Sequence, residues 1–138
     1  MDRATLYQFL AQHRYGVVSS ISQDCVPQSA LVGIAVTADL QVIFDTVESS
    51  RKFANLVARP SCSFVVGWEA EQTAQIEGTA EHLVGERLAY YLPTYLAAWP
   101  DGADRMTWPE IAHFAVRPRW IRYSDFDRTP PFIHEVYL

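Results

Sequence analysis

The chain is short of the residues that build several common functional sites. It has two cysteines, one lysine and six glycines among 138 residues, and its formal net charge is -5. No C-x-x-C pair or Cys/His cluster has zinc spacing, and no G-x-G-x-x-G, P-loop or G-x-S-x-G motif occurs. A chain this acidic also lacks the basic face expected of a nucleic-acid-binding protein. The sequence therefore argues against zinc, Rossmann, P-loop and serine-hydrolase sites, and against a nucleic-acid partner.

Long apolar runs are also missing. No run approaches the ~20 residues that a membrane span needs. Residues 1–5 are polar, and no apolar segment of the signal-peptide type follows them. Cys25 falls in a predicted turn and Cys62 in a predicted strand, so we expect two free thiols in a reducing compartment. The sequence predicts a cytoplasmic protein with no membrane partner.

What the chain does have is enough apolar residues for one core. Hydrophobic residues make up 49% of the sequence and aromatic residues 13%. This composition and length predict a single domain covering residues 1–138. The four histidines, at positions 13, 82, 113 and 134, do not have metal-ligand spacing. We expect them on the surface or hydrogen-bonded in the core, with no metal site, and the sequence names no catalytic residue.

Hydrophobic periodicity predicts six strands and three helices. The strands are expected at 17–21, 27–36, 41–46, 61–68, 73–84 and 112–123, and the helices at 2–14, 50–59 and 86–99. Pro93 should kink the third helix, whereas Gly78 and Pro118 indicate bulges or edges. Residues 103–111 are expected as a loop or one turn, and the apolar tail 125–138 should pack on the barrel or on a second subunit. Short connections predict a mainly β fold, a small closed antiparallel barrel with flanking helices.

One stretch, residues 44–56, combines features that suit an anion. A strand ends near Phe44, Ser50 can cap the helix that follows, and Arg51 and Lys52 lie in its first turn. Positive side chains at a helix N-terminus are unfavourable by about 0.3–1 kcal/mol each, and a bound anion would remove that cost. The stretch is therefore interpreted as a phosphate site. The alternative, two cations on a solvated helix face, stays open.

The same stretch resembles a known signature. Phe44-Asp45-Thr46, Ser50-Arg51-Lys52, Asn55-Leu56 and Arg59-Pro60 are together similar to the flavin-phosphate motif of the pyridoxamine 5'-phosphate oxidase-like family, which are FMN-binding split β-barrels. The resemblance implies a six-stranded antiparallel split barrel that binds FMN at the interface of a homodimer.

The resemblance also implies roles for particular residues. Thr46, Ser50, Arg51 and Lys52 would hold the FMN phosphate, with Asp45 beside them. Ser29, Ala30 and Leu31 would run along the flavin ring. Gln75 would reach the ring edge or the ribityl chain, unless it is simply a solvated strand residue.

Departures from the family pattern bear on the reaction. Where the oxidase that names the family has a strand-two arginine, this chain has Ala30, and where the oxidase has a strand-five glutamine it has Thr73. Residues 125–131 do not match the oxidase's substrate-binding segment. The expected function is therefore an FMN flavoprotein, an oxidoreductase acting on an unidentified small substrate other than pyridoxamine phosphate. The alternatives are a flavin carrier or sensor without turnover, the same barrel with a deazaflavin or haem, and a barrel without a cofactor.

Overall fold

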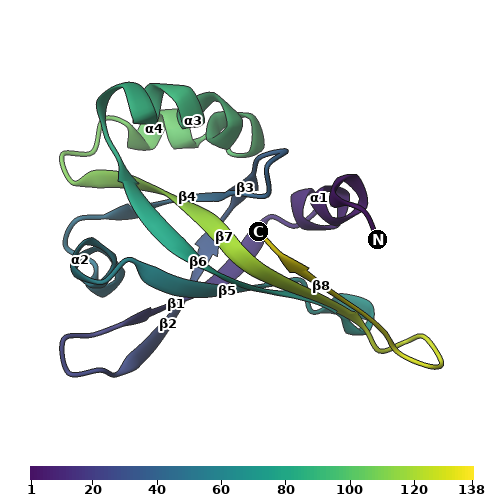
Figure 1. Ribbon diagram of the computed structural model, residues 1–138. Coiled ribbons are helices and arrows are strands. Elements are labelled where there is room, and N and C mark those ends of the chain that lie inside the picture. Colours follow the sequence, from purple (N-terminus) through teal and green to yellow (C-terminus); the bar gives the residue numbers. More distant parts are fainter.

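The computed structural model describes all 138 residues as an antiparallel sheet with flanking helices (Figure 1). Its strands are β1 (Tyr15–Ile21), β2 (Pro27–Gly33), β3 (Ala35–Val36), β4 (Val42–Val47), β5 (Ser61–Val66), β6 (Gln72–Leu83), β7 (Ile111–Asp125) and β8 (Phe132–Tyr137). Its helices are α1 (Arg3–Ala11), α2 (Arg51–Ala58), α3 (Gly85–Ala98) and α4 (Gly102–Arg105), with a 3-10 turn at Glu69–Glu71. The mainly β prediction is confirmed, although the chain has more strands than the predicted six.

The strands form one curled sheet in the order β2-β1-β5-β6-β7-β4-β3. The first and last strands of this order, β2 and β3, follow one another in the chain and meet at Ile34. No backbone ladder joins β2 to β4, so the barrel is not closed along its whole length, in contrast to the closed barrel that was predicted. The sheet is instead a half-barrel whose two ends meet at one point and separate beyond it, where the β1–β2 hairpin extends past α2 (Figure 1).

The predicted strand at 27–36 is broken at Ile34 for a visible reason. The indole of Trp99 packs so closely on Gly33 that a Cβ there would lie 2.7 Å from the Trp99 ring. The amide of Ile34 donates to the carbonyl of Arg14 over 2.9 Å, and its carbonyl accepts from Trp99 Nε1 over 3.0 Å. Because of these bonds, Ile34 belongs neither to the β1–β2 ladder nor to the β3–β4 ladder. Before this residue the chain pairs with β1, and after it the chain pairs with β4.

The predicted bulge at Gly78 and Pro118 is confirmed. Glu77 pairs with Trp120 and Gly78 with Pro118, which leaves Arg119 as the extra residue on β7. A Cβ at Gly78 would lie 2.5 Å from the carbonyl oxygen of Arg117, so only glycine fits this close approach.

The C-terminal tail packs on the barrel, which was one of the two predicted outcomes, and does so as a strand. β8 pairs antiparallel with β7 from Trp120 to Asp125. β7 thus has β4 beside its first half and β8 beside its second half.

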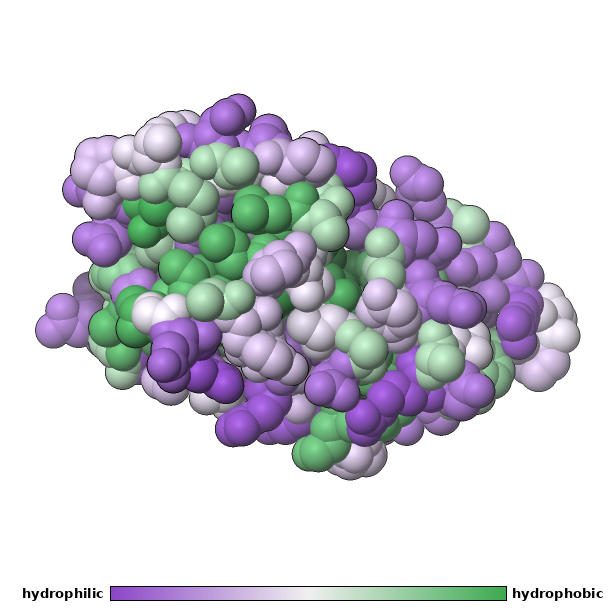
Figure 2. Space-filling model, turned by 90° about the horizontal axis from the view of Figure 1, so that it is seen from above, coloured by the Kyte–Doolittle hydropathy of each residue, from purple (hydrophilic) through white to green (hydrophobic).

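Two apolar layers hold the fold together. Inside the half-barrel, Phe44 stacks on Phe114 with ring centroids 5.5 Å apart and meets Phe64 edge-on at 5.8 Å. A second layer lies between the sheet and α3, where Ile43, Leu83, Tyr91, Tyr95 and Ala115 are buried. Viewed from above, the molecule shows apolar side chains gathered within a polar surround (Figure 2).

The local signals at the helices agree well with the structure. Asp2 caps α1 by accepting from the amide of Thr5 at 2.8 Å. Pro93 lies inside α3, which continues through it as one helix. The segment 103–111, predicted as a loop or one turn, begins with the short helix α4. Cys25 is exposed, Cys62 is buried, and both are free thiols. None of the helices has the length and apolar character needed to cross a membrane.

Candidate anion site at the start of α2

The candidate site is built where β4 ends and α2 begins. Ser50 caps α2: its Oγ accepts from the amide of Phe53 at 3.2 Å and lies 2.9 Å from Thr46 Oγ1. Thr46 is nearly buried, and its position at the end of β4 is fixed by pairing with Ala112. The first amides of a helix have no partner within it, so those of Arg51 and Lys52 remain available to a ligand. Two hydroxyls and two amides thus meet at one helix end.

The two cations of this helix end have no acidic partner. Lys52 Nζ lies 3.4 Å from Thr46 Oγ1, its single hydrogen bond, and neither Lys52 nor Arg51 forms an ion pair. Partial burial of Lys52 lowers the pKa of its ammonium below the usual value, because burial penalises the charged form. An anion placed beside Lys52 would offset this penalty and the repulsion from the helix dipole.

The opposite wall of the site is the inner face of the β1–β2 hairpin. Asn55, buried on α2, donates from Nδ2 to Ser20 Oγ at 3.0 Å and to Gln28 Oε1 at 2.9 Å. These bonds hold the hairpin against the helix. Between the hairpin and α2 lies a cleft of about 90 Å³, lined by Ser20, Gln28, Ser29, Ala30, Arg51 and Lys52.

Ser20, Gln28 and Asn55 are site residues that the sequence reasoning did not assign. Asn55 was quoted in the family signature without a role. The alternation of side chains along β2 could have indicated Gln28, because residues at even positions of this strand face inward, as Ala30 does. What the sequence did not reveal is that this inward face meets α2.

The predicted residues on β2 and β6 separate onto two faces. Ala30 faces the cleft. Ser29 borders the cleft, but its hydroxyl bonds Ser19 Oγ at 2.8 Å on the outer face of the sheet. Leu31 is 63% exposed on that outer face, and the strand registers run from Leu31 through Val17 and Val65 to Gln75. Leu31 and Gln75 therefore lie on a different face of the sheet from Lys52.

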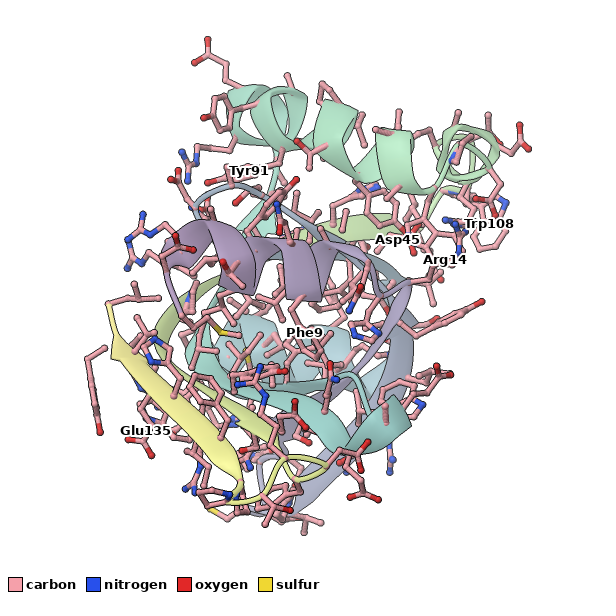
Figure 3. All side chains as sticks on the ribbon, turned by 90° about the vertical axis from the view of Figure 1, so that its right-hand side faces the viewer. Phe9, Arg14, Asp45, Tyr91, Trp108 and Glu135 are labelled. Atoms are coloured by element: carbon pink, nitrogen blue, oxygen red, sulfur yellow. The ribbon has the colours of Figure 1, made fainter.

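Asp45 also points away from the cleft. Its neighbour Thr46 faces the barrel interior, so Asp45 faces the side of α3 and α4 (Figure 3). Its Oδ2 accepts from Arg105 Nε at 2.7 Å, and Arg105 also bonds Asp101 at 3.0 Å and the hydroxyl of Tyr95 at 3.2 Å. Asp45 raises the pKa of Arg105, and burial raises the pKa of Tyr95 to about 12. This network joins β4 to α4 and was not foreseen from the sequence.

The histidines differ in part from what was expected. His113 is buried and His13 is half-buried, yet the Nε2 atom of each is buried without a hydrogen-bond partner. Burial lowers the pKa of both imidazoles, which favours the neutral form. His82 packs between Phe53 and Phe114. No three His, Cys, Asp or Glu side chains come together as a metal site.

Comparison with known proteins identifies the class to which this architecture belongs. The family model described as pyridoxamine 5'-phosphate oxidase matches residues 3–125. The chain therefore belongs to the pyridoxamine 5'-phosphate oxidase family, as the sequence signature indicated. A search of curated proteins finds no match.

Several solved structures share the fold. A heme binding protein from Mycobacterium smegmatis superposes with a TM-score of 0.83 at 15% identity, over 99% of this chain and 58% of that one. General stress protein 26 from Bacillus anthracis gives a TM-score of 0.71 at 19% identity, over 97% and 96%. A pyridoxamine 5'-phosphate oxidase-related, FMN binding protein from Nostoc punctiforme gives 0.68 at 11% identity, over 99% and 92%. At such identities the likeness establishes the fold alone.

Proposed function

We propose that this protein binds FMN with the phosphate in the cleft at the start of α2. The observation that carries the proposal is the pair of cations there: Lys52 is partly buried and Arg51 exposed, and neither has an acidic partner. The start of α2 supplies free amides, which suit a phosphate dianion. Thr46 and Ser50 do not line the cleft themselves: Thr46 accepts from Lys52, and Ser50 caps the helix beside the cleft. Asp45 acts on the site by fixing the end of β4 through Arg105, and so positions Thr46.

The size of the cleft supports a homodimer. A volume of about 90 Å³ accommodates a phosphate, whereas sites for whole ligands usually span roughly 300–1,000 Å³. The flavin ring must extend beyond the cleft past Ala30. In our proposal a second protomer covers it, using the outer sheet face on which Leu31, Tyr15 and Val65 are exposed. Gln75, on that same face, would then serve the flavin bound by the other protomer.

The proposed activity is that of an oxidoreductase acting on a small molecule. Bound FMN would supply the electron or hydride transfer, and this chain would bind and orient it. A substrate other than pyridoxamine phosphate is supported by Ala30 in the cleft. It is supported as well by Arg128, a residue of the β7–β8 turn whose side chain is paired at 3.2 Å with Asp125 at the end of β7. Oxidation of NAD(P)H by the FMN-loaded protein would distinguish an enzyme from a flavin carrier or sensor.

The test of the binding site is a titration with FMN and with riboflavin, which lacks the phosphate. Replacing Arg51 and Lys52 by alanine removes two charge-assisted bonds of about 1.5–3 kcal/mol each, so FMN affinity should fall about 100-fold or more. Riboflavin should bind the wild type much more weakly than FMN. The control is Arg87→Ala with Arg128→Ala, which removes two exposed arginines outside the cleft. Equal FMN affinity for the cleft variant and the wild type would refute the assignment.

Haem is the second candidate, favoured by the structural likeness to the heme binding protein from Mycobacterium smegmatis. The cleft itself has no His, Cys, Met or Tyr that could ligate haem iron. A visible absorption spectrum after loading separates the two, since haem gives an intense Soret band and flavin a weaker blue-light band. A deazaflavin that replaced FMN at the same cleft would be recognised by its own spectrum.

A further inference from the structure

A groove outside the flavin site lies between the start of α1, the 37–41 turn and the end of β8. It consists of two adjoining cavities of about 460 and 380 Å³, which share Arg3 and Leu138 in their walls. The two halves differ in chemistry. One is polar and cationic, and the other is mostly apolar. Figure 3 shows β8, with Glu135 labelled, beside α1 on this side of the molecule.

Three arginines, at positions 3, 117 and 119, line the cationic half. Alternate residues of a strand face the same side, so Arg117 and Arg119 of β7 both point outward on either side of buried Pro118. Three of the eleven lysine and arginine side chains thus gather at one place in an acidic chain.

These arginines are largely free of acidic partners. Arg117 and Arg119 form no ion pair, and Glu81, whose charge acts on Arg117, is held by two bonds from Arg87 at 2.7 and 2.9 Å. Arg3 has a weak contact of 3.9 Å with exposed Asp39. The cationic half therefore has unsatisfied capacity for an anion.

Buried side chains form the base of the apolar half. Leu6 and Leu40 are each 1% exposed, and Val136 and Met1 pack beside them. Leu40 has a φ of 67°, a left-handed conformation that is rare and costly for a branched side chain. The turn from Thr37 holds it there, with Leu40 N donating to Thr37 O at 2.8 Å. Leu40 belongs to the main core and also lies at the base of the groove.

We propose that the groove binds a free amphipathic anion, a medium-chain aliphatic carboxylate. Its head group lies on Arg117 and Arg119, and its chain lies along Met1, Val136 and Leu138, above the buried Leu6 and Leu40. The forked guanidinium groups match the two oxygens of a carboxylate, and the adjoining apolar surface can contact an aliphatic chain. The two volumes together are in the range of a small-molecule site.

Calorimetric titration of the whole protein with decanoate, below its micelle concentration, tests the proposal. Decanoate should bind with a stoichiometry of one per chain. Butyrate, which has the same head and less chain, and decanol, which lacks the charge, should each bind at least tenfold more weakly. Arg117→Gln with Arg119→Gln should weaken decanoate binding at least tenfold, whereas Arg14→Gln with Arg128→Gln, at two exposed arginines outside the groove, should leave it unchanged.

A second variant examines the apolar half. Val136→Thr keeps the shape of the side chain but replaces one methyl group with a hydroxyl, and should weaken decanoate binding more than butyrate binding. Equal affinity for decanoate and butyrate, or full affinity after loss of both arginines, would overturn the proposal. Binding to phosphatidylglycerol vesicles without binding of monomeric decanoate would also overturn it, since that result would assign the groove to a membrane surface.

Discussion

Replacing Lys52 with methionine should make the ligand-free protein more stable and the flavin-loaded protein less stable. Methionine keeps the length of the side chain, and its helix propensity is close to that of lysine. It removes a partly buried ammonium from the start of α2, where a cation costs about 0.3–1 kcal/mol against the helix dipole. For 138 residues, with an unfolding entropy of about 2.1 cal/mol/K each, the midpoint of thermal unfolding should rise by about 1–3 °C.

Saturating FMN should reverse this order. At a concentration one hundred times its dissociation constant, a ligand stabilises the wild type by about 2.7 kcal/mol. Loss of one charge-assisted bond, about 1.5–3 kcal/mol, leaves the variant about 0.3–1.3 kcal/mol of that gain at the same concentration. The difference exceeds the stability gained by the free variant. Thermal unfolding with and without FMN measures both, and a variant that stays the more stable under both conditions would refute the role of Lys52.

The pH dependence of the ligand-free proteins gives an independent check. Burial lowers the pKa of Lys52 in the folded state below the unfolded value. In the window between the lowered pKa and the usual value near 10.5, the unfolded chain binds more protons, so folding stability gains with rising pH. Below that window the penalty is complete, and above it the penalty is gone. The stability difference between Lys52→Met and wild type should therefore be largest at neutral pH and should disappear at strongly alkaline pH. A difference that does not change with pH would place its origin elsewhere.

Two further predictions concern residues away from the cleft. Asp45→Asn should lower the free energy of unfolding, measured in urea, by about 1–3 kcal/mol, because it breaks an ion pair whose side chains are 15% and 20% exposed. It should weaken FMN binding less than the Arg51/Lys52 variant does. A larger loss of FMN binding free energy than of folding stability would give Asp45 a direct role in binding. Leu31→Asp should convert the proposed dimer to a monomer in light-scattering chromatography, whereas Val84→Asp, at a similarly exposed residue, should not. A dimer that survives Leu31→Asp would place the interface on another face.

Local chemistry accounts for the parts of the structure that the sequence predicted. Ser50 caps α2 because its hydroxyl reaches an amide three residues on, and this relation is visible in the sequence. Gly78 and Pro118 indicated the bulge because each disfavours a regular ladder. In β6, Ala74, Ile76 and Ala80 are buried and Gln75 and Thr79 are exposed, which is the period-two pattern of a strand with one face in the core. Each of these features depends on a few neighbouring residues.

The parts that were missed depend on contacts between distant residues. The break at Ile34 is caused by Trp99, which lies 65 positions away. Arg105, in a segment expected as a loop or one turn, reaches Asp45 across 60 positions. Asn55 joins Gln28 over 27 positions. A single sequence carries no signal for such pairs, because nothing local to either partner specifies the other.

The period-two geometry of β2 explains how one short strand can take part in two proposed sites. Gln28 and Ala30 point inward to the cleft, and Ser29 and Leu31 point outward to the sheet face. A change on the outer face alters the surface for a second protomer without touching the phosphate site, and the reverse holds for the inner face. A one-residue shift in the β1–β2 register would exchange the two faces, so the register itself must be held firmly. The bonds from Asn55 to Ser20 and Gln28 do this, because they fix one inward position on each strand of the hairpin against α2.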